Sequence, residues 1–571
     1  MKRMFFSLFI FLIPITLLSY DILPVDSIKV GMKGYGISVF KNNEPDTFGV
    51  EILGILDKIA PGRRLIIARA SGCGLEKTGI ISGMSGSPIF INGKIIGAAA
   101  YAWSFSIEPI TGITPIEEII ATKRDSIEGG ESGSDIKIPG EGKMSPYSGI
   151  TLTRIQTPLS ISGVDEYLIG EIDKFFGKKG FNVVLGGSQS GVKQEKDSLF
   201  VGSAVAAKLV GGDASMSAIG TVTYVDGKDV FAFGHPLYFS GTTSIPMATA
   251  YVHTIMPSQY SSFKIASVGK EVGAVLQDRG TAIYGLIGEK AKTIPLSITV
   301  TQKRNCKTFH FDVIEHKELT PFLTGTTLLN AILSNARGYG ALSLSLGINL
   351  KLAKYGDVKL KNFFSGESAL TLSLNSISKM LHSILNDVYE EIEINGVEIT
   401  VDVTEEIKTA LIETVKPGSF TVKRGEETDL VVFLKELRGK NLKERFTVRI
   451  PETYTDSIVK IAVVGAEGYK NLESERRAGM FITEKPGDVI KLLKLSPRNN
   501  VLYCLVLSTK PGMIIKGYEF GSLPSSMLHL MKGSQNLGEG RFTRGDIITR
   551  IERECNFAVF GASVVILKVI D

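Results

Sequence analysis

A serine set between two closely spaced glycines is the strongest chemical signal in this chain. Ser85 lies in the run Gly-Met-Ser-Gly-Ser-Pro at 83–88. Glycine adopts backbone conformations that other residues avoid, so Gly83 and Gly86 allow a sharp bend that leaves the Ser85 hydroxyl projecting. In such a turn the amides of Gly83 and Ser85 converge on one point, where they can stabilise an oxyanion. The pattern therefore indicates a nucleophilic serine with an oxyanion hole.

The elements that would hold this turn are also visible in the sequence. Residues 89–91 and 94–100 are apolar and strand-forming, and Asn92-Gly93 between them is the strongest two-residue hairpin signal. A short helix is expected at 115–120, where a proline precedes Ile-Glu-Glu-Ile-Ile. The serine is thus predicted to lie in a unit of short antiparallel strands.

Two blocks of the chain resemble the SpoIVB peptidase family, serine endopeptidases of the chymotrypsin-like clan. In that family a Glu-Lys-Thr-Gly-like run precedes Gly-Met-Ser-Gly-Ser-Pro, and Glu-Lys-Thr-Gly occupies 76–79 here. The second block is similar to the family's Gly-Thr-x-Thr strand and Gly-His dipeptide, with Gly-Thr-Val-Thr at 220–223 and Phe-Ala-Phe-Gly-His-Pro at 231–236. Residues 263–288 resemble the segment that follows. The resemblance implies that Ser85 is the nucleophile and His235 the general base.

The chain departs from the family pattern in two ways that bear on activity. The family places its histidine block first, whereas Ser85 precedes His235 here, so the order is permuted; no PDZ module is evident. The position of the family's aspartate holds Ser71, and a serine cannot stabilise imidazolium as a carboxylate does. Asp278 is the alternative residue for orienting His235. The other interpretation of Asp278 is a surface aspartate paired with Arg279.

The trypsin-like arrangement also implies where a substrate would bind. The strand carrying Ala99, Tyr101 and Trp103 would pair with the backbone of an extended peptide. The expected substrate is a polypeptide, or the chain's own linker at 124–145, whose Glu-Gly-Gly-Glu-Ser-Gly-Ser-Asp core predicts an exposed flexible segment. No metal and no organic cofactor is implied.

The N-terminus and the composition restrict the location and the partners. Lys2 and Arg3 precede an apolar run at 4–18, a pattern typical of a signal peptide, so residues 1–20 are expected to be a signal peptide or an N-terminal anchor. The protein is therefore expected in the periplasm, the cell envelope or outside the cell, with membrane contact only through that segment. The net charge of +5 over 571 residues, without a basic cluster among aromatics, argues against nucleic-acid binding.

The remaining cysteines and histidines carry little chemistry. The four cysteines are far apart, and Cys504 with Cys555 could form one bridge or remain as two buried thiols. His253 is expected to be structural, and no chemistry is assigned to His310, His316 or His382.

The sequence as a whole predicts a mainly β protein. The expected parts are a serine-bearing β-barrel unit at 21–123, the linker, a histidine-bearing β-barrel unit at 146–320, a small α/β unit at 321–395 and an immunoglobulin-like sandwich at 396–571. Apolar residues at helical spacing also predict an amphipathic helix at 164–176, inside the histidine-bearing unit. The predicted function is an exported serine endopeptidase that forms an acyl-enzyme on Ser85. The alternative is a weak or inactive scaffold of the same fold that binds peptides or envelope partners.

Overall fold

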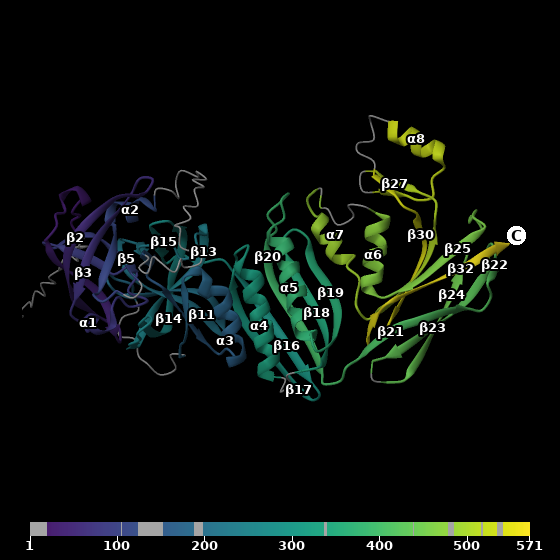
Figure 1. The fold of residues 1–571 in the computed structure, drawn as a ribbon, viewed down its shortest axis with the longest axis horizontal. Coiled ribbons are helices and arrows are strands. Elements are labelled where there is room, and N and C mark those ends of the chain that lie inside the picture. The colour runs from purple at the N-terminus through teal and green to yellow at the C-terminus, as the bar shows by residue number, and fades with distance from the viewer. Residues whose placement is uncertain are drawn as a thin grey trace, which may run out of the picture. The chain divides into compact units, whose positions relative to one another are not determined.

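The computed structural model describes residues 20–103, 106–123, 152–187, 198–335, 340–437, 439–477, 483, 485–515, 518–533 and 541–570. Contacts divide the chain into two units, Met1–Thr293 and Ile294–Asp571 (Figure 1). Strands dominate both units, which confirms the predicted mainly β fold. Among the described helices, none has the length and apolarity needed to cross a membrane.

Six strands of the first unit form a closed ring of pairings that carries Ser85, named the serine ring below. The ring runs β1-β2-β3-β6-β5-β4 and returns to β1. On β2, Phe48, Val50 and Ile52 are buried at every second position, so one face of the strand supplies the core. The strands are β1 (Lys33–Lys41), β2 (Glu44–Ala60), β3 (Arg63–Ser71), β4 (Pro88–Ile91), β5 (Lys94–Trp103) and β6 (Ile110–Pro115). The predicted hairpin and the helix α2 (Ile116–Ala121) are confirmed.

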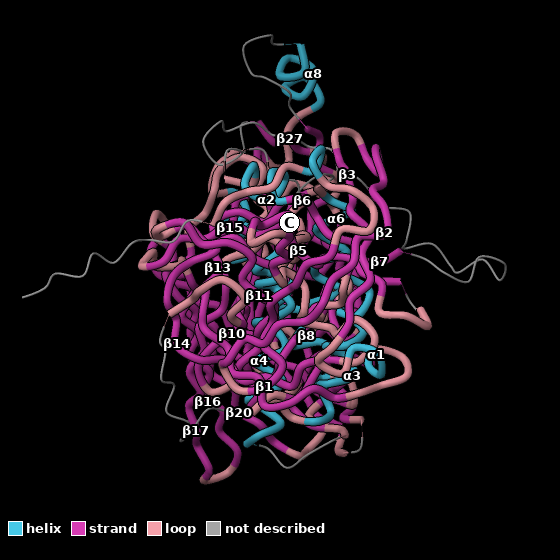
Figure 2. The backbone as a smooth tube through the Cα atoms, turned by 90° about the vertical axis from the view of Figure 1, so that its left-hand side faces the viewer, coloured by secondary structure: helices cyan, strands magenta, loops and turns pink. Residues whose placement is uncertain are grey.

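A second ring of six strands in the same unit carries His235 and is named the histidine ring. It runs β10-β11-β12-β15-β14-β13 and returns to β10, which is the strand order of the serine ring. Strands outnumber helices among the described elements of this unit, and Figure 2 draws strands in magenta. The strands are β10 (Ala204–Gly212), β11 (Ser215–Asp226), β12 (Asp229–Ala232), β13 (Gly241–Met256), β14 (Phe263–Arg279) and β15 (Ala282–Ile287).

Three strands and a helix join the two rings along the chain. β7 (Leu152–Arg154) extends the serine ring by pairing with β5, whereas β8 (Thr157–Ser162) pairs with β11 and with β9 (Phe181–Leu185). The predicted amphipathic helix is present as α3 (Glu166–Phe176), capped by the Asp165 side chain. Only two residues separate β7 from β8, so the chain passes directly from one ring to the other.

The first part of the second unit corrects two predicted boundaries. β16 (Thr293–Gln302) pairs in parallel with β20 (Ile394–Thr404), and β20 pairs with β18 (Leu342–Leu352), which in turn pairs with β19 (Gly356–Gly366). α4 (Leu319–Asn335) contacts α5 (Ala369–Leu385), and α5 packs on β18 and β19. The predicted boundaries at 320 and 396 divide this sheet and are therefore wrong, because strand pairing between distant segments outweighs the local change in pattern.

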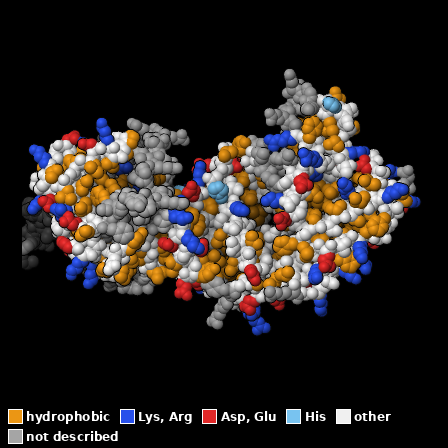
Figure 3. All heavy atoms as spheres, in the orientation of Figure 1, with side chains coloured by type: hydrophobic (Ala, Val, Ile, Leu, Met, Phe, Trp, Pro, Cys, Tyr) orange, Lys and Arg blue, Asp and Glu red, His pale blue; other side chains and the backbone are white. Residues whose placement is uncertain are grey.

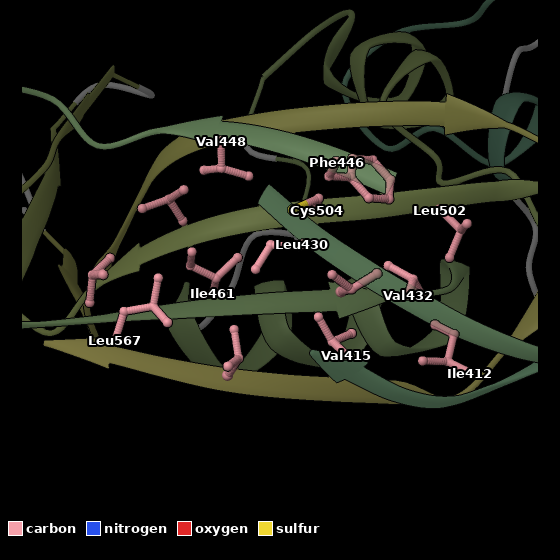
Figure 4. Close-up of a cluster of buried hydrophobic side chains, with 14 of the residues drawn as sticks. Ile412, Val415, Leu430, Val432, Phe446, Val448, Ile461, Leu502, Cys504 and Leu567 are labelled. Atoms are coloured by element: carbon pink, nitrogen blue, oxygen red, sulfur yellow. The ribbon is translucent and has the colours of Figure 1, made fainter. Parts of the chain in front are cut away.

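The C-terminal part contains two sheets that share one hydrophobic core. One sheet is β24-β23-β21-β31 and the other is β22-β32-β25-β26-β30. Leu430 and Phe446 of the first sheet and Ile461, Cys504 and Leu567 of the second lie in the same buried cluster (Figure 4). This is a sandwich, and its immunoglobulin-like topology stays a prediction. The strands are β21 (Thr409–Pro417), β22 (Thr421–Lys423), β23 (Glu427–Glu436), β24 (Asn441–Arg449), β25 (Ile458–Val464), β26 (Val501–Ser508), β30 (Asp546–Glu554), β31 (Ala558–Phe560) and β32 (Ala562–Ile570).

Two predicted segments lie outside the described residues: the signal peptide or anchor, apart from residue 20, and the linker at 124–145. On the face shown in Figure 3, positive and negative side chains are interspersed over the described surface.

Candidate active site

The turn that carries Ser85 consists of two consecutive β-turns. The amide of Met84 donates to the carbonyl of Ile81 at 3.0 Å, and the amide of Ser87 donates to the carbonyl of Met84 at 2.9 Å. Gly83 and Gly86 occupy the third position of each turn with φ of 95° and 93°. A positive φ at this position is the requirement of a type II turn, so the two glycines explain the bend.

The two amides predicted to form an oxyanion hole are available as donors. Among the described residues, the amides of Gly83 and Ser85 have no hydrogen-bond acceptor, whereas those of Met84, Gly86 and Ser87 are all used within the serine ring. Buried amides are nearly always paired, so two unused donors on either side of one residue are unusual. They are the groups that an oxyanion at Ser85 would need.

Backbone contacts hold this turn against the segment that carries His235. The amide of Thr221 on β11 donates to the carbonyl of Ser85 at 2.9 Å, and the carbonyl of Thr221 accepts from the amide of Phe233 at 3.2 Å. A Cβ placed on Gly86 would lie 2.5 Å from the Phe233 nitrogen. Further along, the Thr114 hydroxyl donates to the carbonyl of Gly234 at 2.7 Å. The structure therefore brings the two sequence blocks together although 150 residues separate Ser85 from His235.

His235 is buried as a neutral imidazole with one nitrogen in use. Nδ1 lies 2.8 Å from the carbonyl oxygen of Pro236, so Nδ1 carries the proton and Nε2 keeps its lone pair. Burial lowers the pKa of His235 from 6.5 to about 4; the backbones of Pro236 and Ile155 oppose this fall, and the charge of Arg154 adds to it. At neutral pH the side chain is in the protonation state of a general base.

Ser85 and His235 are not hydrogen bonded to each other in this structure. Ser85 is 0% exposed and His235 2% exposed. Within the described part of the chain, Ser85 Oγ and His235 Nε2 are both buried without a hydrogen-bond partner. The candidate nucleophile and the candidate base therefore each have an unpartnered polar atom buried away from solvent.

Asp278 is neither a partner of the imidazole nor a surface residue, the two positions predicted for it. It is 1% exposed, so it is not a surface residue, and Arg279 donates to Gln277 instead. Its carboxylate accepts the amides of Leu237 at 2.7 Å, Tyr238 at 2.7 Å and Ser240 at 3.0 Å. Burial raises the pKa of Asp278, and these three amides oppose the rise. Asp278 thus holds the loop after His235 and is not hydrogen bonded to the imidazole.

Ser71 does not orient the imidazole either. It is exposed at the end of β3, where it pairs with Gly49 of β2. His235 Nδ1 is already paired with Pro236, and Nε2 has no partner in the described chain, so neither nitrogen bonds to Ser71. The carbonyl oxygen of Pro236 thus occupies the place next to Nδ1 that a carboxylate has in a catalytic triad.

The strand predicted to bind substrate is partly used by the protein itself. Ala99 is committed to the serine turn, because its carbonyl accepts from Gly86 at 2.8 Å and its amide donates to Ser87 at 3.0 Å. Its predicted role in pairing with a peptide is therefore wrong. Tyr101 and Trp103 do lie on a pairing edge, and β7 occupies that edge.

The comparisons with known proteins gave a match in the serine-bearing segment. Residues 19–113 match the family model described as SpoIVB peptidase S55. This segment is therefore similar to the SpoIVB peptidase S55 family. The comparisons with curated proteins and with solved structures gave no match. The family supports a function of the serine peptidase type, and the matched segment contains Ser85 but not His235.

Sequence reasoning missed one polar residue next to the SpoIVB peptidase S55 segment. Lys264 on β14 is 1% exposed, and its Nζ donates to Ser38 Oγ at 3.0 Å and lies 3.4 Å from Thr221 Oγ1. Thr221 Oγ1 donates in turn to the carbonyl of Gly83 at 3.0 Å. Burial lowers the pKa of Lys264 to about 7. The only signal in the sequence is a lysine at an inward position of an alternating strand.

Other titratable groups have structural roles. His253 Nε2 lies 2.7 Å from Ser267 Oγ, in agreement with the structural role expected for it. All four cysteines are free thiols, which decides between the two alternatives for Cys504 and Cys555. Burial raises the pKa of Cys504 to about 12 and that of Cys555 to about 11, so both are unreactive at neutral pH.

Proposed function

We propose that this protein is an exported serine endopeptidase whose two rings act as chymotrypsin-like barrels. The observation that carries the proposal is the junction of the rings. There a serine turn with unused amides at Gly83 and Ser85 is bonded to Thr221, which in turn bonds to the segment that carries the buried, neutral His235. Ser85 lies between the third and fourth strands of its ring, and His235 lies between the third and fourth strands of the other.

The mechanism proposed for these residues is acyl transfer. Ser85 Oγ attacks the carbonyl carbon of a peptide bond while His235 Nε2 takes the hydroxyl proton. The amides of Gly83 and Ser85 stabilise the oxyanion. His235 then donates that proton to the leaving amine, and the carbon–nitrogen bond breaks. Water, activated by the same nitrogen, hydrolyses the acyl-enzyme and regenerates Ser85.

The imidazolium of the transition state would have only a carbonyl on its Nδ1 side. A carboxylate at this position stabilises imidazolium by charge, and a neutral carbonyl does so less. We therefore expect a slower enzyme than one with a complete triad. Asp278 acts as a positioning residue, because it fixes the loop that follows His235.

A fluorophosphonate probe tests the proposal by reading the activation of Ser85 directly. Both the full chain and its Thr153→Pro variant are labelled, because the proline removes an amide from the edge of β7 that pairs with β5 and so loosens β7. The modified residue is mapped by mass spectrometry. We expect labelling at Ser85 that is lost in Ser85→Ala and reduced by about 10³-fold in His235→Gln. Ser217→Ala is the matched control, because Ser217 is another buried serine with an unpartnered hydroxyl and should leave labelling unchanged.

The second candidate function is a peptide-binding scaffold without catalysis. It is favoured by the lack of a hydrogen bond between Ser85 Oγ and His235 Nε2 and by the burial of both residues. No labelling of Ser85 in either background, in protein that melts cooperatively, would support the scaffold and contradict the enzyme.

A further inference from the structure

A strand of this chain lies where the substrate of the proposed peptidase would bind. β7 is antiparallel to the end of β5, with Arg154 opposite Tyr101 and Leu152 opposite Trp103. The pairing continues past the strand, because the amide of Ile155 donates to the carbonyl of Ala100 at 2.9 Å. Addition of an extended segment to an exposed strand edge is the general way in which a sheet binds a peptide.

Ile155 connects this strand to the catalytic residues. Its side chain is 3% exposed and packs in the hydrophobic core of the serine ring, which includes Met84 and Ala99. Its neighbour Arg154 contacts Phe239 in the loop after His235, and the backbone of Ile155 opposes the fall in the pKa of that histidine. The side chain of Ile155 therefore lies in the serine ring at the point where the chain passes to the segment that carries His235.

The chain after Ile155 continues past the serine turn. A Cβ placed on Gly83 would lie 3.2 Å from Pro158 Cγ, so Pro158 lies against the residue that offers an oxyanion amide. On the other side, the guanidinium of Arg154 lies 4.3 Å from the ring centroid of Phe239, in the loop that Asp278 holds. Residues 154–158 thus pass between the two rings beside Ser85 and His235.

We propose that residues 152–155 are a built-in, substrate-like occupant that blocks the active site and reveals its specificity. The site would bind an extended peptide antiparallel to β5, with an aliphatic side chain in the position of Ile155 on the N-terminal side of the reacting carbonyl. External polypeptides would enter only when β7 is displaced. The assignment of this place as an active site rests on the proposed function. The binding of an extended peptide along β5 does not depend on it.

The first test loosens β7 without disturbing the core. Thr153 is exposed and lies opposite Ala102, and Thr153→Pro removes an amide from the pairing edge. Thr153→Ala is the matched control, since it keeps that amide. We expect the rate of fluorophosphonate labelling at Ser85 to rise about tenfold or more in Thr153→Pro and to stay unchanged in Thr153→Ala, because an occluded site reacts only in its open fraction. Measurable labelling at equal rates in wild type, Thr153→Pro and Thr153→Ala would overturn the blocking role.

The second test measures binding and does not depend on catalysis. A fluorescent peptide with the sequence Thr-Leu-Thr-Arg-Ile is titrated into Ser85→Ala and into the double variant Ser85→Ala, Thr153→Pro, and anisotropy is recorded. We expect saturable binding to the double variant and at least about tenfold weaker binding to Ser85→Ala alone. A peptide that ends in Asp in place of Ile should bind the double variant about tenfold more weakly or worse, because its carboxylate would be buried among apolar groups.

The two tests separate failure of this inference from failure of the proposed function. Peptide binding without any labelling would support the occupant and contradict the peptidase. Labelling that is equally fast in all variants, together with no peptide binding, would support the peptidase and contradict the occupant. Thermal melts of each variant identify changes that reflect unfolding.

Discussion

The serine ring and the histidine ring have the same strand order, yet they fix their functional residues by different means. In the serine ring, two glycines with positive φ and two local turn bonds shape the segment at 81–87. In the histidine ring, the segment after β12 contains two non-glycine residues with positive φ, Phe233 at 69° and Phe239 at 61°. Such conformations are held by the surroundings, and the buried carboxylate of Asp278 supplies three of the bonds that hold this one.

The difference shows that one half of the site is determined locally and the other at long range. A turn made by glycines can be predicted from six consecutive residues. A loop held by a carboxylate from the end of β14 depends on residues 38 to 41 positions apart. The predictions below test this contrast and the contact between the rings.

The largest expected effect concerns Lys264, which extends from the histidine ring to the serine turn. Its pKa is about 7 in the folded protein and 10.5 ordinarily, so the unfolded chain binds the additional proton between these values. The free energy of unfolding of wild type should therefore rise from pH 7 to pH 10, relative to Lys264→Met, by up to about 1.4 kcal/mol per pH unit. Urea melts of both proteins at each pH measure this, and parallel curves would show that Lys264 does not titrate with a lowered pKa.

The next effect tests the approach of the two rings at Gly86. In Gly86→Ala the new Cβ would lie 2.1 Å from the carbonyl oxygen of Thr221 and 2.5 Å from the Phe233 nitrogen, so backbone must move. We expect a loss of about 3 kcal/mol or more in the free energy of unfolding. Gly93→Ala is the matched control, because Gly93 also has a positive φ but has open space around it, and it should cost about 1 kcal/mol. Equal losses would mean that the rings do not meet at Gly86.

Acid should weaken the histidine ring through His235. The folded pKa of about 4 lies below the ordinary 6.5, so the contribution of neutral His235 is complete above pH 6.5 and is lost as the pH falls toward 4. We expect wild type to lose about 3 kcal/mol more than His235→Gln between pH 6.5 and pH 4, measured by urea unfolding. An NMR titration in which His235 protonates near pH 6.5 would contradict the buried neutral state.

The smallest expected effect separates the two possible roles of Asp278. As a residue that holds the loop, it should show about a tenfold loss of labelling at Ser85 in Asp278→Asn, because the amide oxygen can replace only one of the two accepting oxygens, that bonded to Tyr238 and Ser240, and the bond to Leu237 is lost. As a direct partner of the imidazole it would lose about 10⁴-fold through the wrong tautomer. The pH dependence of labelling adds a second measure, since loss of a bond to the ring would shift the pKa of His235, and a loosened loop need not.

The sequence predicted the parts of this protein that depend on neighbouring residues. The serine turn, the hairpin at Asn92-Gly93, the helices α2 and α3 and the mainly β character follow from glycine positions and short-range patterns. The histidine block was found by its resemblance to a family, and the structure places it against the serine turn.

The errors arose where distant segments decide the outcome. Asp278 was expected at the imidazole or at the surface, whereas its environment is set by three amides of another loop. Ala99 was expected to face a substrate, but both its backbone groups are used by Gly86 and Ser87. The boundaries at 320 and 396 failed because β16 and β20 pair across about a hundred residues. No local pattern contains these contacts.

β7 and β5 belong to the same chain. Another polypeptide must therefore compete with a tethered segment for the edge of β5. A tethered segment acts at an effective concentration of about millimolar when its linker is short. Only residues 104–151 lie between the paired Trp103 and Leu152. A free peptide of the same intrinsic affinity would therefore bind half of the molecules only near millimolar concentration. Any partner that separated β7 from β5 would lower this threshold without acting on Ser85 or His235, so access to the proposed site would be controlled through the pairing of these two strands.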